Sequence, residues 1–147
     1  MNRFSKILCA VDFDINCAPL IGLAHILCAN SNAELHLLHV ARVPAADQDV
    51  PLPLPHDPWW EKQAREQLSG LASKVLNGSI AYELHVSSGV PERDIVHFAD
   101  KLSADLIVIG THGRTGISHL VLGSVAEEVI RKANCAVITL KSGKSSP

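Results

Sequence analysis

Two widespread nucleotide-binding motifs are missing from this sequence. It contains no Gly-x4-Gly-Lys-Ser/Thr, which holds phosphates in P-loop enzymes, and no Gly-x-Gly-x-x-Gly, which marks dinucleotide-binding folds. The P-loop lysine and a recognisable arginine finger or general base are missing with them, so efficient phosphoryl transfer is not expected.

Long apolar runs and a strong net charge are also absent. No segment approaches the ~18 apolar residues of a membrane span, and the short apolar run near the N-terminus lacks a signal-peptide cleavage site. The formal net charge of −2 argues against recognition of nucleic acid through charge. We expect a cytoplasmic protein with no membrane and no nucleic-acid partner. Its 147 residues predict one domain, 1–147.

The cysteine and histidine residues form no metal or disulfide pattern. The four cysteines include no Cys-x-x-Cys pair, and we expect them to be reduced and buried. His36 and His39 are three residues apart on an expected strand, so they should point to opposite faces. The remaining histidines considered form no spaced cluster: His25, His56, His85 and His97. No metal site is predicted.

Apolar runs alternate with segments of helical periodicity along the whole chain. Strands are predicted over 7–11, 33–41, 80–86, 105–109 and 136–140. Helices are predicted after Pro19, over 64–75, after Pro91 and over 124–133. This alternation is typical of an open α/β fold, Rossmann-like, with a five-stranded parallel sheet and helices on both faces.

The fourth predicted strand leads into the most informative motif of the chain. Gly110, Gly113 and Gly123-Ser124 follow the spacing Gly-x2-Gly-x9-Gly-Ser, between a strand and a helix start. Backbone N–H groups at such a helix start bind phosphate. Arg114 in the same loop either meets a phosphate oxygen or is solvated.

This motif resembles the nucleotide-binding signature of the universal stress protein family, in its ATP-binding branch. The resemblance covers nearly the whole chain and implies the strand order 3-2-1-4-5. It implies ATP as the ligand, with or without Mg²⁺. The residues that it places at the nucleotide are Val11, Asp12, Val40, Ile109, Gly110, Gly113, Gly123, Ser124, Val125 and Ala126.

The chain departs from the family pattern at two places. Many members follow the first strand's aspartate with Gly-Ser, whereas this chain reads Asp12-Phe-Asp-Ile-Asn16, which adds the carboxylate of Asp14. That carboxylate either repels phosphate or helps to hold a metal. Cys135-Ala136 replaces the common Cys-Pro before the last strand, which changes the loop but should leave the pocket as it is.

Several residues near the predicted site have two interpretations. Asp12 is either a turn residue or a ligand contact. Ser124 with Glu127 matches a capping box, which is compatible with phosphate binding. Trp59 and Trp60 have three possible roles: they cap a ligand, pack against a helix start or contact a partner protein.

Two segments are expected to lack regular structure. The segment 42–58 contains five prolines and is either a lid over the ligand or a disordered or partner-facing excursion. The polar tail 142–147 is expected to be flexible.

These features favour an ATP-binding stress-response regulator or nucleotide switch with slow or no hydrolysis. The alternatives are an interaction dimer of the same fold that binds no nucleotide, and an α/β nucleotide-dependent enzyme such as an adenylating synthetase. The motifs of that enzyme class near the first strand do not occur here. The resemblance also implies a homodimer through the last strand, Ala136 to Lys141, and a regulatory protein partner of unknown identity is expected.

Overall fold

The computed structural model describes residues 3–13, 17–42, 58–111 and 122–141. Some of the expectations above concern residues outside these ranges: Asp14, Gly113, Arg114, nearly all of the proline-rich segment 42–58, and the tail 142–147. These remain predictions.

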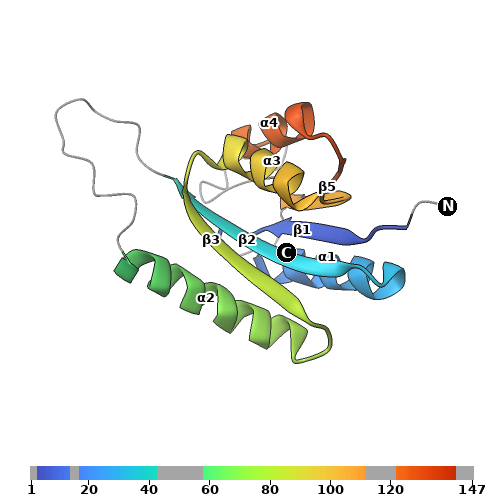
Figure 1. Ribbon diagram of the computed structural model, residues 1–147, viewed down its shortest axis with the longest axis vertical. Coiled ribbons are helices and arrows are strands. Elements are labelled where there is room, and N and C mark those ends of the chain that lie inside the picture. Colours follow the sequence, from blue (N-terminus) through green and yellow to red (C-terminus); the bar gives the residue numbers. More distant parts are fainter. Residues whose placement is uncertain (1–2, 14–16, 43–57, 112–121, 142–147) are drawn as a thin grey trace, which may run out of the picture.

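The described residues form a five-stranded sheet with helices on both faces (Figure 1). The strands are β1 (Lys6–Ala10), β2 (Glu34–Arg42), β3 (Tyr82–Gly89), β4 (Leu106–Gly110) and β5 (Ala136–Leu140). The helices are α1 (Cys17–Ser31), α2 (Pro58–Leu76), α3 (Pro91–Leu102) and α4 (Ser124–Lys132). The strand order is β3-β2-β1-β4-β5, and every neighbouring pair is parallel. The expected fold class and the implied strand order are confirmed.

The apolar residues of the sheet alternate between two cores. Ile7 and Cys9 of β1 belong to the core under α1 and α2, whereas Leu8 and Ala10 belong to the core under α3 and α4. Figure 1 shows these helix pairs on opposite sides of the sheet. Because β1 is covered on both faces, it has the continuous apolar sequence that a central parallel strand requires.

The ends of the helices follow the signals in the sequence. Asn32 (φ 57°) follows α1, and Asn77 (φ 47°) and Gly78 (φ 73°) follow α2, all in the left-handed conformation that ends a helix. Pro91 opens α3, where a missing backbone N–H costs nothing. None of the helices in the described ranges is both long and apolar enough to cross a membrane.

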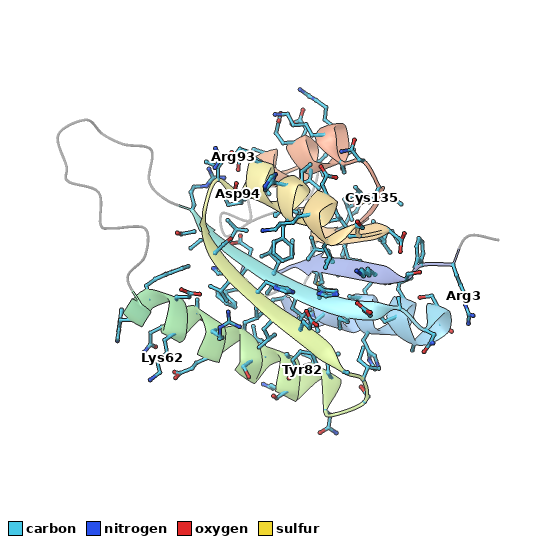
Figure 2. The ribbon with its side chains drawn as sticks, in the orientation of Figure 1. Arg3, Lys62, Tyr82, Arg93, Asp94 and Cys135 are labelled. Carbon is cyan, nitrogen blue, oxygen red and sulfur yellow. The ribbon has the colours of Figure 1, made fainter. Side chains whose placement is uncertain are left out.

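A turn before α3 depends on a glycine. Oδ2 of Asp94 accepts a hydrogen bond from the Val90 N–H at 2.9 Å, and its Oδ1 lies 2.9 Å from Nε of Arg93 (Figure 2). A Cβ atom at Gly89 would collide with this carboxylate. A side chain at residue 89 would therefore displace the Asp94 carboxylate from its hydrogen bond to Val90. The turn leads directly into the first turn of α3, where Glu92 lies.

Two details of the sequence interpretation need correction. The boundaries of the first four strands differ by one to three residues, whereas those of β5 agree. β1 ends at Ala10, so Asp12 follows the strand instead of ending it. All four cysteines are free, as expected, but Cys135 is only partly buried, whereas Cys9, Cys17 and Cys28 are buried. Cys135 immediately precedes β5, which is an edge strand of the sheet and is therefore less covered.

Candidate functional site

A cleft of about 830 Å³ opens beyond the carboxyl ends of the strands. It lies where the strand order reverses between β1 and β4, which is the usual ligand position in open α/β sheets. Its volume is within the range of small-molecule sites. Each predicted site residue that the structure describes lines it: Val11, Asp12, Val40, Ile109, Gly110, Gly123, Ser124, Val125 and Ala126. Gly113 and Arg114 lie outside the described residues.

One wall of the cleft is the start of α4. Gly123 is the N-cap: its carbonyl accepts the Glu127 N–H at 2.9 Å, and its own N–H donates to Thr111 O at 2.6 Å. The predicted capping box is wrong, because Ser124 lies one position inside the helix and Gly123 offers no side chain as a cap. The first N–H groups of α4 therefore have no intrahelical partner, and the residues that carry them line the cleft.

A buried histidine supports the opposite wall. His39 of β2 is 4% exposed, and its Nδ1 lies 2.7 Å from the carbonyl oxygen of Val11. Since a carbonyl only accepts, the proton is on Nδ1. The same ring stacks on Phe13 with centroids 4.0 Å apart, and Phe13 has a left-handed backbone (φ 54°). His39 thus holds the segment that carries Asp12.

The rim of the cleft carries an ion pair between the end of β2 and the start of α3. Nη2 of Arg42 donates to Oε2 of Glu92 at 2.7 Å, and both residues line the cleft. This hydrogen bond to Arg42 lowers the pKa of Glu92 below its ordinary value. Neither residue was predicted, since they are 50 positions apart in the sequence. The clue that was available is Arg42 itself, a charged residue directly after an apolar strand.

Helix α2 supplies the remaining side of the cleft. Trp60, Gln63 and Gln67 line it, and Trp59 next to them is 67% exposed. The sequence left three roles open for these two tryptophans: capping a ligand, packing a helix start or contacting a partner. Their positions differ: Trp60 adjoins the cleft, whereas Trp59 points largely to solvent.

The composition of the cleft fits an anion with an apolar body. Val11, Val40 and Ile109 provide buried apolar surface beside the strand ends, each with 7% or less of its surface exposed. The start of α4, whose N-cap Gly123 makes no side-chain cap bond, offers N–H donors and the positive end of the helix dipole. Asp12 is a carboxylate, which accepts hydrogen bonds and suits the donors of a ligand, not its anionic end.

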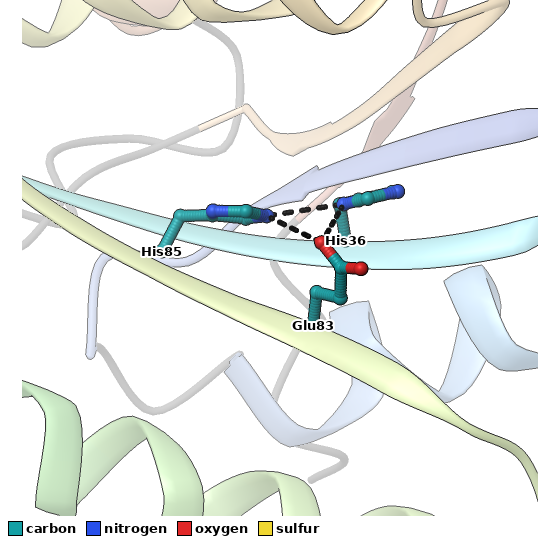
Figure 3. Close-up of side chains that lie close together, drawn as sticks. All are labelled: His36, Glu83 and His85. Carbon is teal, nitrogen blue, oxygen red and sulfur yellow. Dashed lines mark hydrogen bonds and ion pairs between the residues drawn. The ribbon is translucent and has the colours of Figure 1, made fainter.

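A second polar cluster lies apart from the cleft, and it brings together two histidines that were not predicted to meet. His36 and His39 do point to opposite faces, as expected. His85, however, is not isolated: its Nε2 lies 3.0 Å from Nδ1 of His36, with Glu83 beside both (Figure 3). The pairing of β2 with β3 sets His36 opposite Glu83 and Leu38 opposite His85. Spacing along one strand cannot show such a cross-strand pair.

Comparison with known proteins gives the family of this chain. The sequence model of the universal stress protein family matches residues 3–141. Universal stress protein A homolog 1 of Coxiella burnetii is 33% identical over 142 residues, which is 94% of this chain and 96% of that protein. Universal stress protein MJ0531 of Methanocaldococcus jannaschii is 38% identical over 98 residues, 62% of this chain and 58% of the relative.

Solved structures agree with the sequence comparison. The universal stress protein UspA from Lactobacillus plantarum superposes with a TM-score of 0.78 at 23% identity, over 96% of this chain and 100% of that one. A universal stress protein from Archaeoglobus fulgidus in complex with dAMP superposes with a TM-score of 0.67 at 28% identity, over 95% and 100%. The chain therefore belongs to the universal stress protein family.

Proposed function

We propose that the chain binds an adenine nucleotide, ATP first, in the cleft at the strand ends and acts as a nucleotide switch. The observation that carries this proposal is the start of α4, where the N-cap Gly123 has no side chain to cap the helix and Ser124, Val125 and Ala126 line the cleft. Helix starts of this kind bind phosphate. The related Archaeoglobus fulgidus protein in complex with dAMP supports an adenine nucleotide as the ligand.

The two ends of the cleft suit the two ends of the nucleotide. The phosphates contact the backbone of α4, and the base packs on Val40 and Val11, which are 7% and 3% exposed. Asp12 accepts a hydrogen bond from a ribose hydroxyl or the adenine amino group, because its negative charge would repel phosphate. Gly113 and Arg114 belong to this proposal through the sequence motif alone.

We propose that turnover is slow or does not occur. Arg42 is the arginine that lines the described part of the cleft. Its guanidinium group is held by Glu92 in an ion pair at 2.7 Å. An arginine so occupied is not positioned for a phosphoryl group, and a P-loop lysine is not present in the sequence. ATP, with or without Mg²⁺, then acts in the cytoplasm by changing the population of a state that a regulatory partner recognises.

Mass spectrometry under native conditions tests this directly on the protein as purified. We expect an adenine nucleotide to co-purify with the protein, or the mass of one ATP to be added when the protein is titrated with ATP, with and without Mg²⁺. Titration with GTP is the control for recognition of the base. Binding of ATP and GTP with equal affinity would contradict an adenine-specific site. An interaction dimer that binds no nucleotide is the second candidate, since β5 is a sheet edge available for pairing.

A further inference from the structure

We propose that His36, His85 and Glu83 form a binding site for Zn²⁺ on the β2–β3 part of the sheet, separate from the nucleotide cleft. The three side chains come from neighbouring parallel strands and meet at one point (Figure 3). None of the three lines the cleft.

The distances between the three donor atoms match a tetrahedral ion. Nδ1 of His36 lies 3.0 Å from Nε2 of His85 and 3.5 Å from Oε2 of Glu83, and the last two atoms are 3.7 Å apart. Bonds of about 2.0–2.1 Å in tetrahedral geometry set neighbouring ligand atoms about 3.3–3.4 Å apart. The observed triangle brackets this value, so small side-chain rotations are enough to seat the ion.

A fourth residue orients the first ligand. Oε2 of Glu34 lies 3.3 Å from Nε2 of His36, the ring nitrogen that faces away from the triangle. A carboxylate at this place holds the proton on Nε2 and directs the Nδ1 lone pair at the metal position. Such outer carboxylates are typical of histidine zinc sites. Glu34 is thus a positioning residue.

Burial favours the neutral imidazole of His85, and the exposed side chain of Glu83 leaves a way in for the ion. His36 is 2% exposed, and burial, with His36 as the next cause, lowers the pKa of His85. A neutral imidazole is the form that binds a metal. Glu83 is 69% exposed in its side chain, so the ion reaches the triangle from solvent and keeps water as its fourth ligand.

Two imidazoles 3.0 Å apart also form an ordinary hydrogen bond when no metal is present. In that state the Nε2–H of His85 donates to the Nδ1 lone pair of His36, because Glu34 holds the proton of His36 on Nε2. The two accounts differ in the role of Glu83 and Glu34: a metal site depends on both carboxylates, whereas the hydrogen bond also forms in the reverse direction and needs neither. The variants below use this difference.

The test is a titration of the EDTA-treated 147-residue protein with ZnCl₂, followed by calorimetry and by the visible spectrum with Co²⁺ in place of Zn²⁺. The matched variants are His85→Gln, Glu83→Gln and Glu34→Gln, with His97→Gln on the exposed face of α3 as the control. Glu83 and Glu34 are exposed at 69% and 66%, so their variants should fold normally.

Wild type and His97→Gln are expected to bind one Zn²⁺ per chain with equal affinity and to give the strong bands of tetrahedral Co²⁺. Glu34→Gln should weaken Zn²⁺ binding by about 10–100-fold, and Glu83→Gln and His85→Gln by at least as much. The absence of binding at about 100 μM, a range where weak sites are measurable, would overturn the proposal. So would Zn²⁺ binding that is unchanged in both Glu83→Gln and His85→Gln.

Discussion

The Nδ1–H of His39 donates a hydrogen bond to the carbonyl oxygen of Val11 at 2.7 Å, which ties the carboxyl end of β2 to the segment that follows β1. The ring also stacks on Phe13. One buried side chain thus positions both neighbours of Asp12, so the geometry of the proposed ligand contact depends on a residue from another strand.

Replacing His39 should destabilise the fold and displace this segment. His39→Leu removes the donor and leaves the Val11 carbonyl without it in a buried setting, which should cost about 1–3 kcal/mol in the free energy of unfolding. Urea unfolding measures this cost. His97→Leu on α3 changes an exposed histidine and should stay within about 0.5 kcal/mol of wild type. Equal stability of the two variants would show that the His39 bond contributes nothing.

The Arg42–Glu92 pair predicts a pH dependence of stability. The pKa of Glu92 is lowered in the folded chain from an ordinary value of 4.5, chiefly by its hydrogen bond to Arg42. The stabilisation is therefore complete above about pH 4.5 and is lost as the pH falls through the lower folded-state pKa. Arg42 is 52% exposed, so we expect only about 0.2–1 kcal/mol.

Comparison with Glu92→Gln isolates this contribution. Urea unfolding should show a difference in the free energy of unfolding between wild type and variant at pH 7 that shrinks toward pH 3. The other carboxyl groups titrate alike in both proteins, so their effect cancels in this difference. A difference that stays constant over this range would mean that Glu92 does not titrate in the way its ion pair requires.

The two adjacent tryptophans offer an internal control for ligand binding. Trp60 lines the cleft and Trp59 is 67% exposed. In Trp59→Phe, ATP should change the emission of the remaining Trp60. In Trp60→Phe, the emission of Trp59 should change little. The reverse pattern would place the bound nucleotide away from the α2 side of the cleft.

The edge strand β5 predicts a homodimer through Ala136 to Lys141. An apolar edge strand tends to pair, and a two-fold dimer covers the β5 edge of both protomers at once. Light scattering should give about twice the chain mass of 15.8 kDa. The carbonyl of Leu140 accepts the Thr111 N–H, so backbone groups of Ile138 and Leu140 face β4 and those of Thr139 face the open edge. Thr139→Pro removes an edge donor and should weaken the dimer, whereas Thr139→Val keeps it. A monomer at micromolar concentration would contradict the prediction, as would a folded Thr139→Pro dimer of unchanged affinity.

Most of the fold followed from local patterns in the sequence. The apolar run at Ile7 and the helix signals at Asn77-Gly78 and Pro91 predicted their elements, because each reflects a constraint within a few residues. The strand order was implied by the family resemblance and not by periodicity. The position of Ser124 was misjudged, since Gly123 is also an accepted N-cap residue, although serine is the more common one.

The parts that were missed depend on contacts between distant residues. Arg42 and Glu92, and His36 and His85, come from separate elements, and only the β2–β3 register and the placement of α3 bring them together. His39 was predicted only to point to the opposite face of its strand from His36, and its bond to Val11 requires the pairing of β1 with β2. Periodicity within one element carries no such information.

The most direct test of the proposed function is calorimetric titration of ATP into wild type, Ser124→Asp and Ser73→Asp. An aspartate in the first turn of α4 suits the helix dipole and should preserve the fold, but it places negative charge where the phosphates are proposed to bind. Ser73→Asp adds the same charge on an exposed part of α2 that does not line the cleft. Circular dichroism checks that both variants fold.

We predict that wild type and Ser73→Asp bind ATP with equal affinity and that Ser124→Asp binds at least about tenfold more weakly, a difference of ~1.4 kcal/mol. No heat with wild type at about 100 μM, where binding of ~5.5 kcal/mol would be detected, would contradict nucleotide binding. Equal affinity of Ser124→Asp and wild type would contradict the placement of the phosphates at the start of α4.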